Sequence, residues 1–378
     1  MSRKTILYVM PTLLLDGPGQ VLHGIVRHLD RSRFNAVVVG ILAPRAGSWP
    51  DGRGALRGMG VDVIDLALPK PWDAFSVPSL VRVMRDIRPD VIHTQLVRAD
   101  LYGQLAELLC HAPRLVSTVH YVEDWARSAN PLWNCVRAFS GLMQRRVDCL
   151  VSVSESVQQD VLRVFGRRAR RYEVILNGIE PTDPATVSPP SLASQLGWPA
   201  GTVTVLSVGR LHPRKNFDFL IDAFAQMLKA TRAGAGLVIV GDGPLRQALQ
   251  AKVMNLGIAE AVHFAGHRND VPGLMRQADI FAICSHGEGL SIAALEAMDA
   301  GLPCVVTDVP GLNEAVRDGL TGCLVPPGNA DACARALATL VQSPDRRACM
   351  GLAGRAEVLR CFTAEAMSQK YQELYLEC

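Results

Sequence analysis

Short apolar runs recur along the first half of the chain, separated by segments long enough for a helix. They are residues 6–10, 36–42, 61–66, 91–93, 115–120 and 149–153. A run that is apolar at every position is typical of a strand buried on both faces of a parallel sheet. Alternation with helix-length segments indicates β–α–β units. The first half is therefore predicted to form an α/β domain around one parallel sheet.

The same alternation returns in the second half. Apolar runs at residues 203–208, 236–240, 262–265, 279–284, 303–306 and 323–325 predict a second parallel sheet. Between the halves, prolines 181, 184, 189, 190 and 199 lie among serines and alanines, as in a hinge. We therefore expect an α/β protein with domains at residues 1–178 and 179–360, followed by a helix over 361–378, where Met367, Tyr371 and Tyr375 recur at helical spacing.

Length and composition agree with two such domains. A chain of 378 residues with 49% hydrophobic residues is ample for two cores, on the loose rule of roughly 150 residues per domain. Ten cysteines show no CxxC pair and no metal-like spacing, so we interpret them as small buried apolar residues in a reducing compartment and expect no metal site.

The start of the chain and its apolar runs bear on localisation. No run approaches the roughly 18 residues that a membrane-spanning helix needs. The apolar segment 5–15 contains Pro11, is followed by Asp16 and has no small-residue cleavage site, so it is predicted to be a first strand rather than a signal peptide. We expect a cytoplasmic protein.

Charge is uneven between the halves. Residues 1–180 carry 23 Lys and Arg against 17 Asp and Glu, a net charge of +6, whereas residues 181–378 carry 16 against 19, a net charge of −3. The basic half includes Arg145, Arg146, Arg167 and Arg168, which either form a solvated face or rest on an anionic membrane surface at the inner side of the membrane. Nucleic acid is not expected as a partner, and the charges do not indicate an oligomeric state.

Two carboxylates eight residues apart give the most informative chemistry. Glu288 lies in a glycine turn after the apolar run 279–284, and Glu296 lies about two helical turns further on. Ligands of open α/β sheets bind outside the carboxyl ends of the strands, and a helix that opens at Gly289, Leu290 and Ser291 directs its positive end and its amides at phosphate. A glutamate beside phosphate would repel it, so we expect both carboxylates to accept hydrogen bonds from sugar hydroxyls.

Cations and glycines follow two other predicted strands. After residues 203–208, Arg210 can form a forked contact with phosphate oxygens and Lys215 can act as a point charge. After residues 236–240, Gly241 and Gly243 form a tight turn where backbone can approach a ligand closely.

These motifs resemble glycosyltransferase family four, strongly over residues 200–330 and weakly in the first half. The matching positions, in the family's order and spacing, are Arg210 with Lys215, Gly241-Asp242-Gly243-Pro244, Phe264-Ala265-Gly266, Glu288 with Glu296, and residues 319–328. The resemblance implies a GT-B fold, with two Rossmann-like domains facing across a cleft, and a retaining transfer reaction. It also implies that the first domain binds the acceptor, that the second binds the nucleotide sugar, and that the final helix crosses back over the first domain.

The resemblance assigns roles to single residues. Arg210 and Lys215 would bind the donor diphosphate, Glu288 the transferred sugar and Glu296 the ribose. The amides of Gly289, Leu290 and Ser291 would bind the phosphates. The expected donor is a nucleotide diphosphate sugar, with uridine as the expected nucleoside and no further cofactor, and the expected acceptor is a glycan or a lipid-linked glycan.

In the first half, two sites follow the same logic. His120 ends the run 115–120, where the family commonly has a histidine that touches the donor sugar, and a neutral imidazole can donate a hydrogen bond there. The turn with Gly17 and Gly19 follows the first strand, so its amides are expected to reach the phosphates. Pro18 and Gln20 depart from the family's pattern of two glycines and a later glutamate.

A helical stripe is the last candidate in this half. Leu132, Val136, Phe139 and Met143, with Trp125 and Trp133 nearby, are predicted to pack in the core. The alternative is a helix that faces lipid or the acceptor.

Together, the motifs and the resemblance predict a metal-independent hexosyltransferase, and its retaining course is what the resemblance implies. Charge develops on the leaving diphosphate, where Arg210, Lys215 and the helix-start amides would stabilise it. A nicotinamide oxidoreductase is disfavoured because Gly241-Asp242-Gly243 lacks the third glycine of GxGxxG. A protein of the same fold that only binds or hydrolyses a sugar nucleotide, or a phosphorylase, stays open.

Overall fold

The computed structural model describes residues 3–43, 50–69, 75–110, 114–123, 126, 130–182, 191–231 and 234–377, without the side chains of residues 131 and 132. The chain forms two compact units, residues 1–179 with 364–378 and residues 180–363. The sequence analysis placed these boundaries at residues 178 and 360. Pro184, Pro189 and Pro190 of the expected hinge lie outside the described residues.

The first unit is built on a seven-stranded parallel sheet with the order β3-β2-β1-β4-β5-β6-β7. Its strands are β1 (Lys4–Met10), β2 (Phe34–Leu42), β3 (Asp62–Leu68), β4 (Val91–Gln95), β5 (Leu115–Val119), β6 (Cys149–Ser152) and β7 (Arg171–Val174). The apolar runs of the sequence did not predict β7, a four-residue edge strand that begins with an exposed arginine and has no continuous apolar run.

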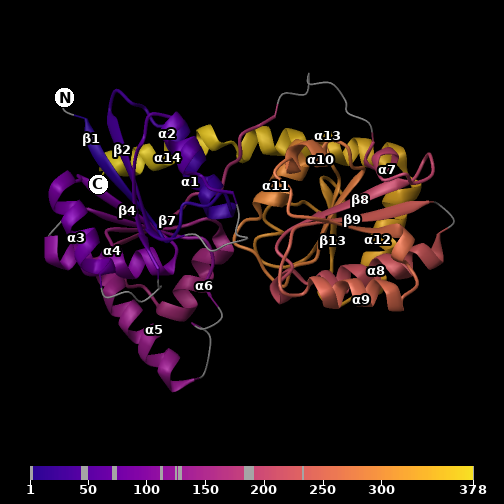
Figure 1. Cartoon of the computed structure of the whole chain (residues 1–378), viewed down its shortest axis with the longest axis horizontal. Coiled ribbons are helices and arrows are strands. Elements are labelled where there is room, and N and C mark those ends of the chain that lie inside the picture. Colours follow the sequence, from indigo (N-terminus) through magenta and orange to yellow (C-terminus); the bar gives the residue numbers. More distant parts are fainter. Residues whose placement is uncertain are drawn as a thin grey trace. The chain divides into compact units, whose positions relative to one another are not determined.

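Helices cover both faces of this sheet (Figure 1). They are α1 (Gly17–Arg27), α2 (Arg53–Gly58), α3 (Ser76–Ile87), α4 (Val97–Cys110), α5 (Pro131–Met143), the short 3-10 helix η2 (Gln144–Arg146), α6 (Glu155–Phe165) and α14 (Ala364–Glu377). Because helices bury the sheet from both sides, β1 and β2 are buried at nearly every position rather than at every second one. The central strand β4 is also fully buried, although it contains His93, Thr94 and Gln95.

The C-terminal helix α14 is part of the first unit, where it packs against α1. Its Tyr371 and Tyr375 are fully buried. The Tyr375 hydroxyl lies 2.6 Å from Nδ1 of His93 on β4, and the Tyr371 hydroxyl lies 3.0 Å from Thr118 Oγ1 on β5. The last residues of the chain thus complete the interior of the unit that its first residues begin.

The second unit is built on a six-stranded parallel sheet with the order β10-β9-β8-β11-β12-β13. Its strands are β8 (Val203–Val208), β9 (Ala235–Val240), β10 (Val262–Gly266), β11 (Ile280–Ile283), β12 (Cys304–Thr307) and β13 (Gly322–Val325). Its helices are α7 (Leu192–Gln195), η3 (Pro213–Lys215), α8 (Phe217–Ala230), α9 (Arg246–Asn255), η4 (Ala259–Ala261), α10 (Val271–Met275), α11 (Ile292–Asp299), α12 (Ala330–Gln342) and α13 (Pro344–Cys361).

Strand order reverses once in each sheet. In the first sheet the reversal lies between β1 and β4, and in the second it lies between β8 and β11. Such a switch point is where open α/β sheets bind ligands, just beyond the carboxyl ends of the strands. The loops after these four strands are therefore the expected positions of a ligand-binding site.

Candidate active site

Two loops of the second unit meet at its switch point. The loop after β8 carries Lys215 and the loop after β11 carries Glu288, and these strands are neighbours. Lys215 Nζ donates to Glu288 Oε1 at 2.7 Å, and Ser285 Oγ donates to the same oxygen at 2.5 Å. Two residues that are 73 positions apart in the sequence thus form one ion pair.

This pair is partly enclosed. The side chains of Lys215 and Glu288 are 25% and 13% exposed. Burial acts to raise the pKa of Glu288, but the charge and hydrogen bond of Lys215, the hydroxyl of Ser285 and the charge of Arg214 outweigh it, so this pKa is lowered. Glu288 is therefore a carboxylate at neutral pH that can accept hydrogen bonds.

Further hydrogen bonds fix the two loops against each other. Arg214 Nε donates to the Gly287 carbonyl at 2.9 Å, and the His286 amide donates to the Arg214 carbonyl at 2.9 Å. Thr307, at the end of β12, donates to the Ser285 carbonyl at 2.7 Å. The Glu288 side chain is thus held by a backbone that three strand ends support.

The local sequence explains the position of Lys215. Pro213 opens the single turn η3, and Asn216 ends it in the left-handed conformation (φ 52°) before α8 begins. Asparagine tolerates this conformation better than most residues. The side-chain carbons of Lys215 lie over Gly209, 3.5 Å from where a Cβ atom would stand there.

Arg210 lies on the same loop as Lys215 but is exposed. Its guanidinium forms no hydrogen bond or ion pair with the residues that the structure describes. The structure therefore leaves its expected contact with phosphate untested.

The glycine turn after β9 packs against the loop after β8. Gly241 has φ +130°, and a Cβ atom there would stand 2.0 Å from the Gly209 carbonyl oxygen. The Leu211 amide donates to the Asp242 carbonyl at 2.9 Å. Glycine at position 241 is thus required by the close approach of two loops, and its part in donor binding stays a prediction.

The helix after Glu288 begins slightly later than expected. Ser291 is the N-cap of α11 and accepts from the Ala294 amide, and the helix starts at Ile292. Gly289 and Leu290 therefore precede the helix rather than open it. Glu296 lies partly buried in the helix, four positions after its start.

In the first unit, His120 follows β5 and is 6% exposed. Its Nε2 lies 3.0 Å from Gln95 Oε1 at the end of β4. Burial lowers the pKa of His120 to about 4, so the ring is neutral at pH 7. The neutral ring has one nitrogen that donates and one that accepts, and Nε2 is the one that faces Gln95. The expected contact of His120 with a donor sugar stays a prediction.

The turn with Gly17 and Gly19 forms the N-terminus of α1. Asp16 caps the helix by accepting from the Gly19 amide at 3.1 Å, and a Cβ atom at Gly19 would stand 1.8 Å from the Leu14 carbonyl oxygen. The Gly19 amide is therefore already bound by a carboxylate. A phosphate role for Gly17 and Gly19 stays a prediction.

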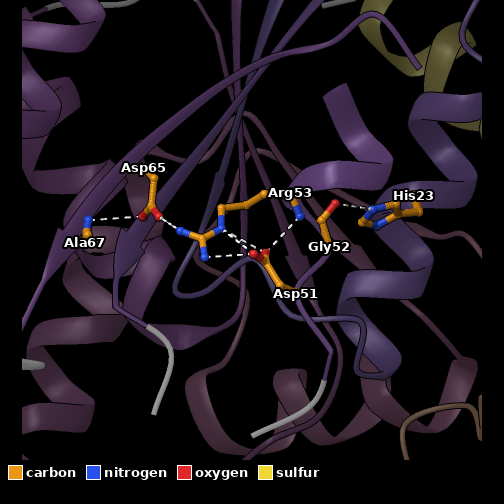
Figure 2. A network of polar contacts seen from close by, with 6 residues as sticks. All are labelled: His23, Asp51, Gly52, Arg53, Asp65 and Ala67. Atoms are coloured by element: carbon orange, nitrogen blue, oxygen red, sulfur yellow. Dashed lines mark hydrogen bonds and ion pairs between the residues drawn. The ribbon is translucent and has the colours of Figure 1, made fainter. Parts of the chain in front are cut away.

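A polar network holds the start of α2 between α1 and β3 (Figure 2). Arg53 lies between Asp51 and Asp65 and bonds to both, and His23 Nε2 of α1 lies 3.1 Å from the Gly52 carbonyl. On the other side of the same ring, Nδ1 lies 2.8 Å from the Gly19 carbonyl. His23 thus links the turn before α2 to the first turn of α1.

Helix α5 departs from its expected packing. Met143 is buried, but Trp133, Phe139 and Leu142 are 37%, 44% and 55% exposed. The prediction that the stripe packs in the core is therefore wrong for Phe139. Trp125 and the side chain of Leu132 lie outside the described residues.

The cysteines agree only partly with their expected role. The nine that the structure describes are free, and Cys149, Cys284, Cys304 and Cys333 are buried, but Cys135 and Cys349 are exposed. Within the described ranges, no cluster of three or more His, Cys, Asp or Glu residues could hold a metal ion.

Models of two related protein families match the two halves of the chain. Glycosyl transferases group 1 match residues 190–357, and Glycosyltransferase Family 4 matches residues 15–183. The chain belongs to the group 1 glycosyltransferases. The resemblance expected from the motifs is confirmed.

Individual glycosyltransferases are similar over most of this chain. The UDP-Gal:alpha-D-GlcNAc-diphosphoundecaprenol alpha-1,3-galactosyltransferase of Escherichia coli is 26% identical over 312 residues, which are 81% of this chain and 80% of that protein. Glycogen synthase of Mycobacterium tuberculosis is 28% identical over 306 residues, 77% of this chain and 70% of that protein. The crystal structure of Anabaena HepE in complex with UDP and glucose matches 100% of both chains with a TM-score of 0.84 at 23% identity. The predicted GT-B fold is thereby confirmed.

Several polar partners in this glycosyltransferase were not indicated by the sequence motifs. Ser285 and Arg214 support the Lys215–Glu288 pair, and Gln95 fixes the ring of His120. Ser285 and Arg214 each lie within three positions of a residue that the motifs indicated, so their neighbourhood was the available signal. Gln95 carried no such signal.

Proposed function

We propose that this glycosyltransferase transfers a hexosyl group from a uridine diphosphate sugar to a hydroxyl group of a glycan or lipid-linked glycan, with retention at the anomeric carbon and without a metal ion. The observation that carries the proposal is the Lys215–Glu288 pair at the switch point of the second sheet. UDP-galactose in the name of the E. coli relative and UDP in the HepE complex support the choice of donor.

In this proposal Lys215 stabilises the leaving diphosphate. Its ammonium group has three donors, of which one is on Glu288. The others are available for phosphate oxygens, where negative charge grows as the glycosidic bond breaks. Arg210 on the same loop adds a second positive charge, and the backbone at 289–291 adds amides near the start of α11.

Glu288 then has two tasks. Its carboxylate accepts hydrogen bonds from the hydroxyls of the transferred sugar, and it holds Lys215 in position before the donor arrives. Glu296 is assigned to the ribose hydroxyls. The neutral ring of His120 is assigned to a hydrogen bond with a sugar hydroxyl through its second nitrogen.

The test compares variants of Lys215 and Glu288 with matched controls. With UDP-glucose and UDP-galactose as donors, Lys215→Ala and Glu288→Gln are expected to slow release of UDP by roughly a hundredfold or more, as for the loss of one preorganised charge contact. Lys252→Ala and Glu357→Gln are the controls, because Lys252 and Glu357 form partly buried ion pairs elsewhere in the unit. UDP release at the wild-type rate from Lys215→Ala would exclude that residue from the site.

Two further measurements complete the test. UDP is expected to raise the melting temperature of the wild-type protein, because a ligand that binds only the folded state stabilises it. Proton NMR of the sugar first released from UDP-glucose is expected to show the α anomer, and the β anomer would contradict retention. Release of sugar without transfer to any glycan acceptor would instead favour the hydrolysing protein of the same fold.

We also propose that helix α5 rests on an anionic membrane surface. Its residues Cys135, Ala138, Phe139 and Leu142 are exposed and apolar, while Met143 packs inward and the polar Asn134 is also exposed. An exposed apolar patch on a helix marks an interaction surface. The lipid-linked acceptor in the name of the E. coli relative supports such a position.

Charge complements this apolar face. Arg145 is exposed one turn beyond Leu142, and Arg168 approaches the helix at Gly141, 4.0 Å from where a Cβ atom would stand. Arginines beside exposed aromatic and aliphatic side chains favour the interface of an anionic bilayer. Within the described residues, no helix is long and apolar enough to cross a membrane.

A further inference from the structure

A pocket lies in the first unit between β5 and helices α4, α5 and α6. Its polar lining includes Asp100, Gln104, Ser117, Ser140 and Gln144, and its apolar lining includes Leu101, Val161 and Phe165. Val119 and Tyr121 also line it and flank His120 in the sequence, which places the pocket beside the carboxyl end of β5. That edge of a parallel sheet is where ligands bind.

Three polar side chains in this pocket have hydrogen-bonding capacity that the protein does not use. Oδ1 of Asp100 accepts from Thr94 at 2.6 Å and from Ser117 at 2.7 Å, whereas Oδ2 has no partner among the described residues. Gln144 Oε1 is enclosed and accepts no hydrogen bond from the described chain. Gln104 is 3% exposed, and its side chain forms no hydrogen bond with a described residue.

Such groups are costly unless something pairs with them. A buried acceptor without a partner loses the hydrogen bonds that water would give it, and most buried polar atoms in native proteins are paired. One enclosed acceptor on Gln144 and the unused hydrogen-bonding capacity of Asp100 and Gln104 around one apolar-walled space therefore indicate a ligand that supplies hydrogen-bond donors.

The charges around the pocket limit the class of ligand. No lysine or arginine is among the described residues that line it, and the lining includes the carboxyl groups of Asp100 and Glu123. Of two nearby arginines, Arg146 is paired with Glu107, and Arg137 donates to the carbonyl of the lining residue Ala126. The carboxyl groups in the lining disfavour phosphate and carboxylate ligands, and uncharged hydroxyl donors fit.

We infer that this pocket binds an uncharged, polyhydroxylated ring of the acceptor, such as a sugar or cyclitol residue. Hydroxyl groups donate to Asp100, Gln104 and Gln144, and the apolar face of the ring packs on Phe165 and the aliphatic side chains. The inference rests on the proposed function, since it assigns to the first unit the recognition of the molecule that receives the sugar. Acceptor specificity then depends on α4 and α5.

The test uses the full chain and three probes: methyl α-D-glucopyranoside, methyl α-D-galactopyranoside and myo-inositol. Saturation-transfer NMR is expected to detect at least one of them on the wild-type protein. Ser140→Phe, which fills the pocket from α5, is expected to abolish the signal. Ala138→Phe places the same side chain on the exposed side of α5 and is expected to leave the signal unchanged.

A milder variant covers the case in which Ser140→Phe does not fold. Gln144→Ala is expected to weaken binding of the same probe by about three- to tenfold, the loss of one hydrogen bond. Absence of binding by all three probes, or wild-type affinity in Gln144→Ala together with an unchanged signal in a folded Ser140→Phe, would overturn the inference.

The UDP melting shift separates this inference from the proposed function. Lys215 and Glu288 lie in the other unit, so the shift is expected to persist in Ser140→Phe. A wild-type protein that shifts with UDP but binds no polyol contradicts the pocket alone. A protein that binds a polyol in the pocket but neither binds UDP nor consumes a UDP-sugar contradicts the proposed function alone.

Discussion

At the scale of single residues, Asp100 combines an unusual environment with a clear pH dependence. Burial raises the pKa of its carboxyl group to about 6, although hydrogen bonds from Thr94 and Ser117 act to lower it. The folded protein therefore binds this proton more tightly than the unfolded chain does, where the ordinary value is 3.8. The free energy of unfolding should accordingly fall as the pH rises from about 4 to about 6. Above that range the carboxyl group is ionised and the full loss of stability is present.

Replacing Asp100 by asparagine isolates this effect. Asp100→Asn is expected to melt at a higher temperature than the wild type at pH 8, with a gain in unfolding free energy of up to about 3 kcal/mol, because each pKa unit corresponds to about 1.36 kcal/mol. The gain should disappear near pH 4, where the wild-type carboxyl group is protonated. Asp86→Asn, at a side chain that is 72% exposed, is the control. An equal gain at both pH values would contradict the assignment.

The sequence predicted individual site residues better than their partners. Strand ends and glycine turns indicated Lys215 and Glu288, which the structure joins in one ion pair. They did not indicate Asp100 on α4, because its hydroxyl partners Thr94 and Ser117 lie on two neighbouring strands, β4 and β5. These contacts therefore depend on the register between the strands. A pattern along one chain specifies a periodicity but not which distant residue a side chain meets.

At the scale of elements, α5 shows what helical spacing leaves open. The spacing of its apolar residues predicted a helix, which exists over Pro131–Met143. The same spacing suggested that Phe139 packs in the core, whereas 44% of Phe139 is exposed. Periodicity shows that one side of a helix differs from the other, but it does not show whether the apolar side faces protein or lipid.

Vesicle binding tests the proposed role of α5. The wild-type protein is expected to sediment with vesicles that contain phosphatidylglycerol and to remain in solution with pure phosphatidylcholine vesicles or at high salt, since screening weakens attraction to anionic lipid. Phe139→Ser with Leu142→Ser should lose this binding. Leu352→Ser with Leu359→Ser removes two exposed leucines of α13 and should bind as the wild type does. Undiminished sedimentation of the α5 variant would rule out this surface.

At the scale of the whole molecule, the two units should differ in their response to acid. His93 and His120 both lie in the first unit, and burial lowers their pKa values to about 3 and about 4, with the charge of His120 adding to the effect on His93. Each is neutral in the folded protein and protonated in the unfolded chain below about pH 6.5. The stability that each contributes is therefore present above pH 6.5 and is lost as the pH falls toward the folded-state pKa.

Calorimetry and hydrogen exchange can follow this difference. Between pH 6.5 and 4.5 each histidine should remove about 2 to 3 kcal/mol from the stability of the first unit, and proton uptake by Asp100 should return part of it. Peptides from β4 and β5 are expected to lose protection at pH 5, while peptides from β8 and β9 keep theirs. His120→Gln should reduce the number of protons taken up on unfolding by about one, and the unfolding free energy should depend less on pH accordingly. Parallel losses in both sheets would contradict the prediction.

Much of the architecture was predictable at this scale. Apolar runs alternating with helix-length segments indicated two parallel sheets, and both exist. The membership of α14 in the first unit was expected only from the family resemblance, because helical spacing of Tyr371 and Tyr375 does not specify which sheet they cover. Their contacts with His93 and Thr118 span more than 250 residues.

The position of α14 has a consequence for biosynthesis. Residues 180–363 are continuous and contain their entire sheet, so this unit can mature as soon as it has left the ribosome. Residues 1–179 emerge earlier but must wait for Tyr371 and Tyr375, which are translated after the whole second unit. Domains generally fold in the order of their synthesis, whereas here the nascent chain is expected to complete its second unit first and to keep the earlier one exposed to chaperones until α14 has emerged.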